Sequence, residues 1–464
     1  MKEIKTRIIP IHQTFVKIKG EKHELDYKAI CLFTALGFFL DTDTYWKDEK
    51  VLPPASINII DEEGFLISSK PWFNWCYKPQ KVNLEQSVAQ FSLLFEKIIK
   101  KQSEGKKVIL PLSGGLDSRT QAVALKKIGV KVKSYSYSFE KGYKESRISK
   151  KIAKKCNFPF NEFTIPKSYL WNAINDLSKT NQCYSEFTHP RQMAVINEVG
   201  QLGDSFSLGH WGDVLFDSDN YSNNISEKEL LQILKNKIIK KGGIELANSL
   251  WSSWNIKGDF ENYLEDRLLT LLNRIQIENT NAKIRAFKSL YWAPRWTSIN
   301  LSIFESKHEI NLPYYDDEMC KFICTIPENI LADRKIQIEY IKNTNSKVAK
   351  ILWQDARPFN LYNYHLSKFP YNFPYRLVNK TKRMLNSFFN KKLIQRNWEL
   401  QFLGKANQEE VSKYLFSIEL TDLVEKKIIK KYSNLFYNKN QVYYSHSVSM
   451  LLTLAVFLKQ KTNE

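Results

Sequence analysis

Hydrophobic and polar positions follow three patterns in the first hundred residues, and each predicts a different element. Residues 6–20 alternate, which predicts strand structure, and residues 55–69 have the pattern of a hairpin around the turn residues 61–64. Residues 29–40 are almost wholly apolar, which is too short a run for a membrane span of ~20 residues and predicts a buried helix. Residues 84–101 carry apolar side chains three and four positions apart, which predicts an amphipathic helix.

From Lys107 onward the pattern changes to strands alternating with helices. Such an alternation predicts a parallel sheet covered by helices on both faces, an α/β fold. After about residue 225 the chain is predicted to be mostly helical, with many aromatic residues to fill a core. We expect strands at 108–112, 130–139, 161–165 and 204–209, and helices at 119–128, at 145–156 and after Pro166.

The charge of the chain is strongly basic but widely spread. Its 464 residues carry a formal net charge of +20, with lysine abundant throughout, which favours a general compositional bias over a nucleic-acid surface. The one concentration is 376–396, with seven basic residues and no acidic one. That stretch is interpreted as a helix with a solvated basic face, or alternatively as a surface for a membrane, RNA or a protein partner.

The six cysteines are far apart and lack the CxxC spacing of zinc or redox sites, so we expect reduced thiols. The first residues contain no apolar segment typical of a signal peptide. Together with the absence of a predicted transmembrane segment, these features predict a cytoplasmic protein.

A serine- and glycine-rich turn follows the predicted strand at 108–112, in the sequence Ser113-Gly114-Gly115-Leu116-Asp117-Ser118. Ligands of open α/β sheets bind beyond the carboxyl ends of strands, and glycines let backbone N–H groups approach an anion at a helix start. Asp117 would repel a phosphate, so its presence indicates a Mg²⁺ between the two. The spacing and lysine of a Walker loop are absent.

This six-residue stretch resembles the SGGxDS pyrophosphate loop of the ATP pyrophosphatase (PP-loop) group, and within it the asparagine synthetase-like proteins. Three further stretches, in family order, support the resemblance: 145–165 resembles the segment after the second strand, 207–217 resembles SGxGGDELFGG, and 309–319 resembles EvRxPFLDxxL. The resemblance covers roughly residues 30–360.

The resemblance implies a doubly wound, adenine nucleotide alpha hydrolase-like domain that uses ATP and Mg²⁺. It implies that Asp117 and Asp213 hold the metal, that Glu309 orients or deprotonates an amine, and that Arg357 is a candidate catalytic cation. The residues expected to bind ATP or pyrophosphate are Ser113, Gly114, Gly115, Leu116, Asp117, Ser118, Ser138, Phe139, Gly209 and Gly212.

The N-terminal part looks like the closing portion of the family's glutaminase domain, including a variant of its LPPG stretch at 52–55. That domain needs a cysteine directly after the initiator methionine, where this chain has Lys2, so we expect no glutamine hydrolysis. The expected domains are a β-rich glutaminase-like remnant at 1–82, an ATP-binding domain at 83–360 and a helical extension at 361–464.

Several positions depart from the family pattern. Val214 replaces the second carboxylate of the Asp-Glu pair, and Asn311 replaces an arginine. The late lysine of the family is not found, which leaves Arg357, Lys335 and Lys342 as alternative cations. His189 has no acidic or cysteine partner at ligand spacing and is interpreted as a helix start, and His210 is expected to line the pocket.

The implied function is an ATP-dependent, AMP- and pyrophosphate-forming amide ligase. Its substrate would be a small-molecule, glycan or peptide carboxylate, and its nitrogen would come from ammonia, an amine or a partner glutaminase. Two alternatives stay open: a nucleotide-binding pseudoenzyme or assembly subunit, favoured by Val214, and an RNA-modifying PP-loop enzyme, favoured only by charge. We expect no nucleic-acid partner.

Overall fold

The structure is a computed structural model that describes residues 1–462 except 144–145, 376, 379–380 and 382–392. The basic stretch predicted at 376–396 lies largely outside the described residues, as does Glu145 at the start of the predicted helix 145–156.

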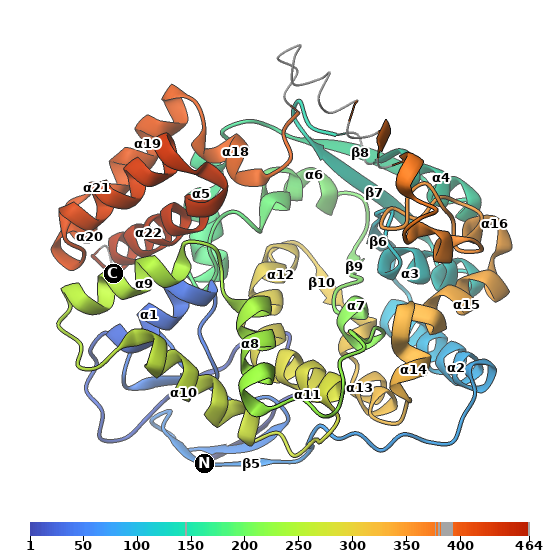
Figure 1. The fold of residues 1–464 in the computed structure, drawn as a ribbon, viewed down its shortest axis with the longest axis horizontal. Helices are drawn as coiled ribbons and strands as arrows, with labels where there is room; N and C mark the ends of the chain where they lie inside the picture. Colours follow the sequence, from blue (N-terminus) through green and yellow to red (C-terminus); the bar gives the residue numbers. More distant parts are fainter. Residues whose placement is uncertain (144–145, 376, 379–380, 382–392, 463–464) are drawn as a thin grey trace.

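Five parallel strands form the central sheet, in the order β10-β9-β6-β7-β8 (Figure 1). Four of them were predicted, and the sheet with its mostly helical remainder fits the predicted α/β fold. The fifth, β10, has three residues and gave no strand pattern. The strands are β6 (Val108–Pro111), β7 (Val132–Phe139), β8 (Phe160–Ile165), β9 (Ser205–Ser207) and β10 (Glu309–Asn311).

The strand order places a topological switch point between β6 and β9. The chain runs outward from β6 to β7 and β8, then returns to the other side of β6 to form β9 and β10. The loops after β6 and β9 therefore diverge, which opens a crevice at the carboxyl ends of these two strands. The connecting segments are α3 (Asp117–Lys127), α4 (Ser146–Cys156), α5 (Leu170–Asn181), η1 (Arg191–Val195), α6 (Ile196–Gly200) and α7 (Gly212–Leu215).

Local sequence explains why the elements around the crevice form where they do. In β6, Val108, Ile109 and Leu110 are all buried, as expected of a central strand covered on both faces. The predicted amphipathic helix is α2 (Leu84–Ser103), and it begins with a capping box in which Asn83 and Gln86 exchange side-chain to backbone hydrogen bonds. Helix α2 packs against α3 and so supports the strand–helix junction.

The N-terminal segment contains two small antiparallel sheets, β1-β4-β5 and β2-β3. The hairpin around residues 61–64 is confirmed, but the strand predicted over 6–20 is mostly wrong. Ile8 and Ile9 are instead fully buried in the main core, with the Ile8 N–H bonded to Asp317. The elements are β1 (Lys2–Lys5), β2 (Phe15–Lys17), α1 (Tyr27–Leu36), β3 (Glu49–Val51), β4 (Ser56–Ile60) and β5 (Leu66–Pro71).

The larger of two hydrophobic clusters among the described residues includes residues from Ile8 to Phe457, and α1, the predicted buried helix, lies inside it. A small second cluster lies among the N-terminal strands and consists of Val16, Leu52 and Ile60. Helix α1 packs against α9 (Gly243–Ser253), which joins the N-terminal strands to the helical part (Figure 1). The division into domains at residues 82 and 360 stays a prediction.

The remainder is helical, as predicted. The helices before the last hundred residues are α8 (Glu227–Ile238), α10 (Phe260–Asn273), α11 (Thr280–Phe287), the π-helix η2 (Lys288–Thr297), α12 (Ser298–Glu305), η3 (Pro313–Tyr315), α13 (Asp317–Ile323), α14 (Glu328–Leu331), η4 (Ala332–Arg334), α15 (Lys335–Thr344) and α16 (Ser346–Ala349). Those that follow are η5 (Tyr364–Ser367), α18 (Asn397–Phe402), α19 (Lys405–Leu415), α20 (Ile418–Leu423), α21 (Lys426–Asn434), η6 (Leu435–Lys439) and α22 (Gln441–Thr462).

Helix α22 has the length and apolar composition needed to cross a membrane, and it is the one such helix among the described residues. Every residue from Ser447 to Phe457 is buried, and the helix packs against α19, α20 and α21. Packing inside the protein therefore accounts for its apolar composition.

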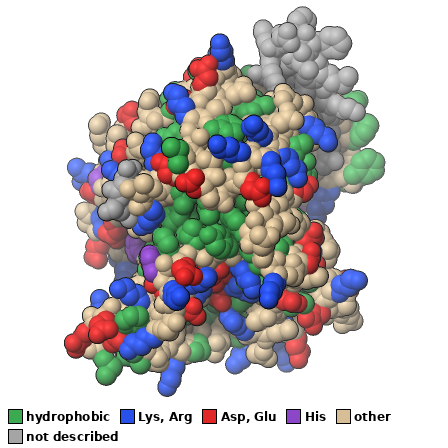
Figure 2. Space-filling model, turned by 90° about the vertical axis from the view of Figure 1, so that its left-hand side faces the viewer, with side chains coloured by type: hydrophobic (Ala, Val, Ile, Leu, Met, Phe, Trp, Pro, Cys, Tyr) green, Lys and Arg blue, Asp and Glu red, His purple; other side chains and the backbone are tan. Residues whose placement is uncertain are grey.

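Basic side chains are dispersed on the face shown in Figure 2, where lysine and arginine alternate with acidic residues rather than gathering in one patch. This distribution agrees with the interpretation of the net charge as a general compositional bias.

The contact between α1 and α9 leads to a stability prediction. A Cβ added to Gly243 would lie 2.6 Å from the carbonyl oxygen of Ala35, which is backbone and cannot move aside alone. We expect Gly243→Ala to lower the free energy of unfolding by about 1–3 kcal/mol, measured by urea denaturation. Gly200→Ala, whose Cβ would make only ordinary contacts, is the matched control, and equal stability of the two variants would contradict the prediction.

Candidate active site

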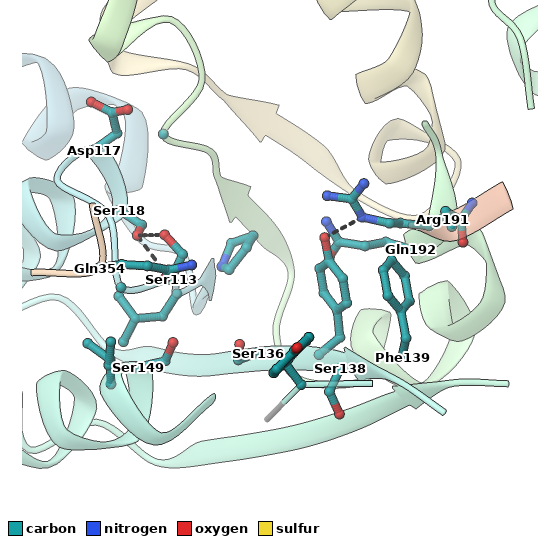
Figure 3. A pocket seen from close by; sticks show the side chains of 18 of the residues that line it. Ser113, Asp117, Ser118, Ser136, Ser138, Phe139, Ser149, Arg191, Gln192 and Gln354 are labelled. Carbon is teal, nitrogen blue, oxygen red and sulfur yellow. Dashed lines mark hydrogen bonds between the residues drawn. The ribbon is translucent and has the colours of Figure 1, made fainter. Parts of the chain in front are cut away.

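The loop between β6 and α3 is held open by its own serines. The Ser113 N–H donates to the Ser118 hydroxyl at 3.0 Å, the two hydroxyl oxygens lie 3.0 Å apart, and the Gly115 N–H donates to the Ser113 hydroxyl at 3.2 Å (Figure 3). Gly114 is buried and Leu116 packs into the core. The serines therefore fix a turn that begins α3 at Asp117, with the backbone of the glycines around it.

Two glycines in the site are required by close packing. A Cβ on Gly114 would lie 2.5 Å from the side-chain oxygen of Gln354, and one on Gly212 would overlap the Asp117 carboxylate. A Cβ on Gly209 would be less crowded, at 3.1 Å from the Asp117 Cβ and the Ser118 nitrogen. The loop after β9 can thus approach the start of α3, and Gln354 can approach the serine–glycine loop, only because these positions lack side chains.

A buried arginine lies beneath the loop. Arg119 is fully buried and donates to the carbonyl oxygens of Gly114 at 3.0 Å, Ile351 at 3.0 Å and Leu352 at 2.8 Å. The Gln354 N–H also donates to the Gly114 carbonyl, at 3.1 Å. These bonds fasten residues 351–354 over the loop. Sequence reasoning missed Arg119, because no pattern distinguishes a carbonyl-binding arginine from a solvated one.

The two predicted metal ligands come from neighbouring strand ends, as expected. Asp117 begins α3 after β6, and Asp213 lies on α7 after β9, exposed to the crevice. The Asp117 side chain, 22% exposed, accepts hydrogen bonds from Arg334 and, at 3.0 Å, from Gln337. Burial raises the pKa of Asp117 to about 6, against the attraction of Arg334 and with the repulsion of Asp213.

The two carboxylates fit a magnesium ion only in part. Mg²⁺ prefers six oxygen ligands, and no group of three or more histidine, cysteine, aspartate or glutamate side chains suited to a metal occurs among the described residues. Phosphate oxygens and water would have to complete the shell. Asp213 repels the negative charge of Asp117, so a cation near both carboxylates is stabilised. Arg334 is such a cation, and against the opposing effect of burial both carboxylates raise its pKa.

The crevice continues into a cavity of about 1950 Å³. The predicted adenine residues Ser138 and Phe139 line it from the end of β7, together with Ser136 (Figure 3). Arg191 lies beside the end of β7, away from the serine–glycine loop, and its Nε donates to the Tyr137 hydroxyl at 2.6 Å (Figure 3). The cavity therefore extends from the serine–glycine loop along the end of β7 to Arg191.

Of the three alternative cations, the structure brings only Arg357 to the cavity. Its Nε is buried and has no hydrogen-bond partner among the described residues. Lys335 donates to the Asn329 carbonyl at 2.9 Å, and Lys342 forms an ion pair of 2.7 Å with Glu339. Both lysines are thus engaged away from the cavity.

Glu309 is not brought together with the other predicted residues. It is the first residue of β10, at the amino end of the strand, whereas the cavity lies at the carboxyl ends. Its side chain is 62% exposed and forms an ion pair of 2.6 Å with Lys106. The motif resemblance did not predict this strand, and so could not tell that Glu309 lies at the end of it that is away from the cavity.

The two histidines differ from each other in their surroundings. The interpretation of His189 as lacking an acidic partner is wrong, because its Nε2 lies 2.9 Å from Glu186, a buried carboxylate three residues earlier. His210 lines the cavity, as predicted. Shielding from bulk water lowers the pKa of His210 to about 4, so its imidazole is neutral at pH 7.

Comparisons with known proteins find a family match over the segment that contains the serine–glycine loop. Residues 91–195 match the protein family described as asparagine synthase, a segment that contains the serine–glycine loop, β7 and β8 but neither Asp213 nor Arg357. No curated protein matches the chain. A solved structure of NMN synthetase from Francisella tularensis is 10% identical over 45% of this chain and 93% of its own, with a TM-score of 0.23, which is too low to carry an argument.

Over residues 91–195 the chain is therefore similar to asparagine synthases, and this match supports an ATP-dependent ligase of the PP-loop class.

Proposed function

We propose that the protein is an AMP- and pyrophosphate-forming ligase that joins a carboxylate to ammonia or an amine. The observation that carries the proposal is the meeting of the serine–glycine loop, Asp117 and Asp213 at one topological switch point, on a cavity that also holds the end of β7. Backbone N–H groups at a helix start suit a pyrophosphate, and the carboxylates suit its metal.

In this proposal Ser113, Gly114, Gly115 and Ser118 bind the pyrophosphate, and Ser138 and Phe139 lie against the adenine. Asp117 and Asp213 would hold Mg²⁺, which when bound offsets the repulsion between carboxylate and triphosphate. Arg357 is one of the cations that line the same cavity, which suits it to charge that develops on the phosphates.

The reaction has two steps. A carboxylate oxygen of the substrate attacks the α-phosphorus of ATP and the bond to the pyrophosphate oxygen breaks. The nitrogen of ammonia or an amine then attacks the acyl carbon, AMP leaves with the bonding electron pair, and the nitrogen loses a proton. Because Glu309 lies at the wrong end of its strand, we assign it no part in this proton transfer.

A pseudoenzyme is the competing proposal, and one observation favours it. Val214, which stands where the family has a second carboxylate, lines the cavity beside Asp213. A site with fewer carboxylates would bind a nucleotide without completing the reaction, and pyrophosphate release separates the two proposals.

Asp117→Asn should remove the reaction while preserving the loop. We expect pyrophosphate release from ATP and Mg²⁺, measured across candidate carboxylates with ammonia and small amines, to fall by about a hundred-fold or more. Asp266→Asn, an exposed carboxylate on α10, is the control that should behave as the native chain. ATP binding by the native chain with no release under any acceptor would favour the pseudoenzyme instead.

The raised pKa of Asp117 predicts a pH dependence of metal-assisted nucleotide binding. A metal ligand must be deprotonated, and Asp117 with a pKa near 6 becomes neutral as the pH falls through that value. We expect the apparent affinity for ATP with Mg²⁺, measured by calorimetry, to weaken between pH 7.5 and 5. The pH dependence of ATP affinity in Asp117→Asn is the control, because it contains only the protonation of ATP itself and of other groups. If the native chain and this variant show the same pH dependence, Asp117 is not the titrating metal ligand.

Variants of Arg357, Lys335 and Lys342 can be compared directly for their effect on kcat. Arg357→Met should lower kcat by about a hundred-fold, because its guanidinium faces the cavity. Lys335→Met and Lys342→Met should leave kcat near the native value, since both lysines have partners elsewhere. Steady-state pyrophosphate release by the three variants tests this ranking, which a larger loss in either lysine variant would reverse.

A further inference from the structure

The side of the cavity away from the serine–glycine loop is made of aromatic and basic side chains. Helix η2 contributes Lys288, Trp292 and Trp296, spaced four residues apart, which a π-helix with its wider turn places along one face. Trp211 continues this face from the loop after β9, and His189 continues it at the other end. We refer to these five residues as the indole wall.

The rings of the indole wall are in continuous contact. Ring centroids lie 6.3 Å apart between Trp211 and Trp292, 5.9 Å between Trp292 and Trp296, and 4.7 Å between Trp296 and His189. Neighbouring rings are inclined to each other by 63° to 88°, and Trp211 is only 6% exposed, so the half-buried Trp292 and Trp296 are the indoles that a ligand in the cavity could contact.

One end of the wall is held by a residue with an unfavourable backbone conformation, and the other by a buried carboxylate. Trp211 has a φ of 78°, in the left-handed region that bulky side chains avoid, and its indole N–H donates to the Ser289 hydroxyl at 3.1 Å. Glu186, 2% exposed, holds His189 and also accepts from the N–H and hydroxyl of Thr188. Strained residues and buried charges persist where the surroundings hold them, often at binding sites.

Lys288 supplies a positive charge to the wall. Its Nζ lies 5.4 Å from the ring centre of Trp292 and 5.9 Å from that of Trp211, and no carboxylate lies within ion-pair distance among the residues the structure describes. Burial lowers the pKa of Lys288, and the attraction of Asp213 opposes that shift. An ammonium in this position would gain from an anionic ligand.

The cavity has room for a second substrate of considerable size. Its volume of about 1950 Å³ exceeds the roughly 300–1,000 Å³ typical of a site for one drug-sized ligand. A nucleotide on the loop side would leave the indole wall uncovered.

We infer that the indole wall binds the carboxylate substrate of the proposed ligase, and that this substrate is an acidic saccharide of the uronic-acid type. The inference rests on the proposed function. Indole faces pack against the C–H faces of sugar rings, Lys288 would bind the carboxylate, and His189 and Arg191 would bond hydroxyl groups. A peptide is less suited, since helix and loop side chains form the wall, and among the described residues of the wall no strand offers an edge to pair with a peptide backbone.

The test uses the full chain without nucleotide and measures binding by saturation-transfer NMR. The probes are galacturonate, galactose, aspartate and phenylacetate. Galacturonate should bind about tenfold or more tightly than galactose, because one charge-assisted hydrogen bond contributes roughly that factor. Lys288→Gln should remove this preference, while Trp296→Leu should weaken both sugars.

Matched controls are Lys257→Gln, on an exposed turn, and Trp46→Phe, which lies outside the cavity. If Trp296→Leu fails to fold, Lys288→Gln carries the test alone. Absence of galacturonate binding, tighter binding of aspartate or phenylacetate, or binding that Lys288→Gln does not change would each overturn the inference.

Pyrophosphate release with the same acids separates this inference from the proposed function. Release with aspartate but no galacturonate binding would preserve the ligase and overturn the saccharide. Lysine-dependent galacturonate binding without release under any amine would preserve the saccharide site and overturn the ligase.

Discussion

The Asp117 carboxylate lies at the start of α3 with Gly212 against it, Arg334 and Gln337 bonded to it, and Asp213 near enough to repel it. A carboxylate that is only 22% exposed needs a partner, because leaving one member of a buried ion pair alone costs roughly 3–5 kcal/mol. The chain meets that need from a distant segment. Asp333 and Arg334 both adopt left-handed backbone, a conformation that costs about 1–3 kcal/mol per residue and here brings the guanidinium to the carboxylate.

Several features of the structure around Asp117 are needed to hold its carboxylate at the start of α3. The loop after β9 must approach Asp117 closely, so Gly212 lacks a side chain where a Cβ would collide, and Gly114 lacks one where Gln354 packs against it. The buried Arg119 holds the serine–glycine turn in shape. Its guanidinium donates hydrogen bonds to the carbonyl oxygens of Gly114, Ile351 and Leu352. Stability thus depends on the same few residues as the proposed function, since Arg334 neutralises the Asp117 carboxylate and Arg119 holds the loop in place.

The sequence predicted the parts of this site that depend on local pattern. Strand–helix alternation and the motif Ser113–Ser118 were sufficient to predict the sheet and the loop, and adjacent strand ends placed Asp117 beside Asp213. Contacts across long sequence separations were not predictable. Arg334 lies 217 residues after Asp117, and nothing in its neighbourhood signals an ion pair. Glu309 shows the opposite limit, since a recognisable motif does not reveal which end of a three-residue strand its acid occupies.

The loop after β9 belongs to both sides of the cavity, and this shared origin explains its unusual sequence. Gly209, Gly212 and Asp213 face the serine–glycine loop, whereas Trp211, between them, turns the other way to meet η2. Trp211 has a left-handed backbone conformation, which turns the chain sharply at this residue. Its side chain can therefore point in a different direction from those of the residues beside it. The position of the proposed metal ligand is therefore tied to the aromatic surface through adjacent peptide bonds, so that the two sides of the cavity have a fixed relation to each other.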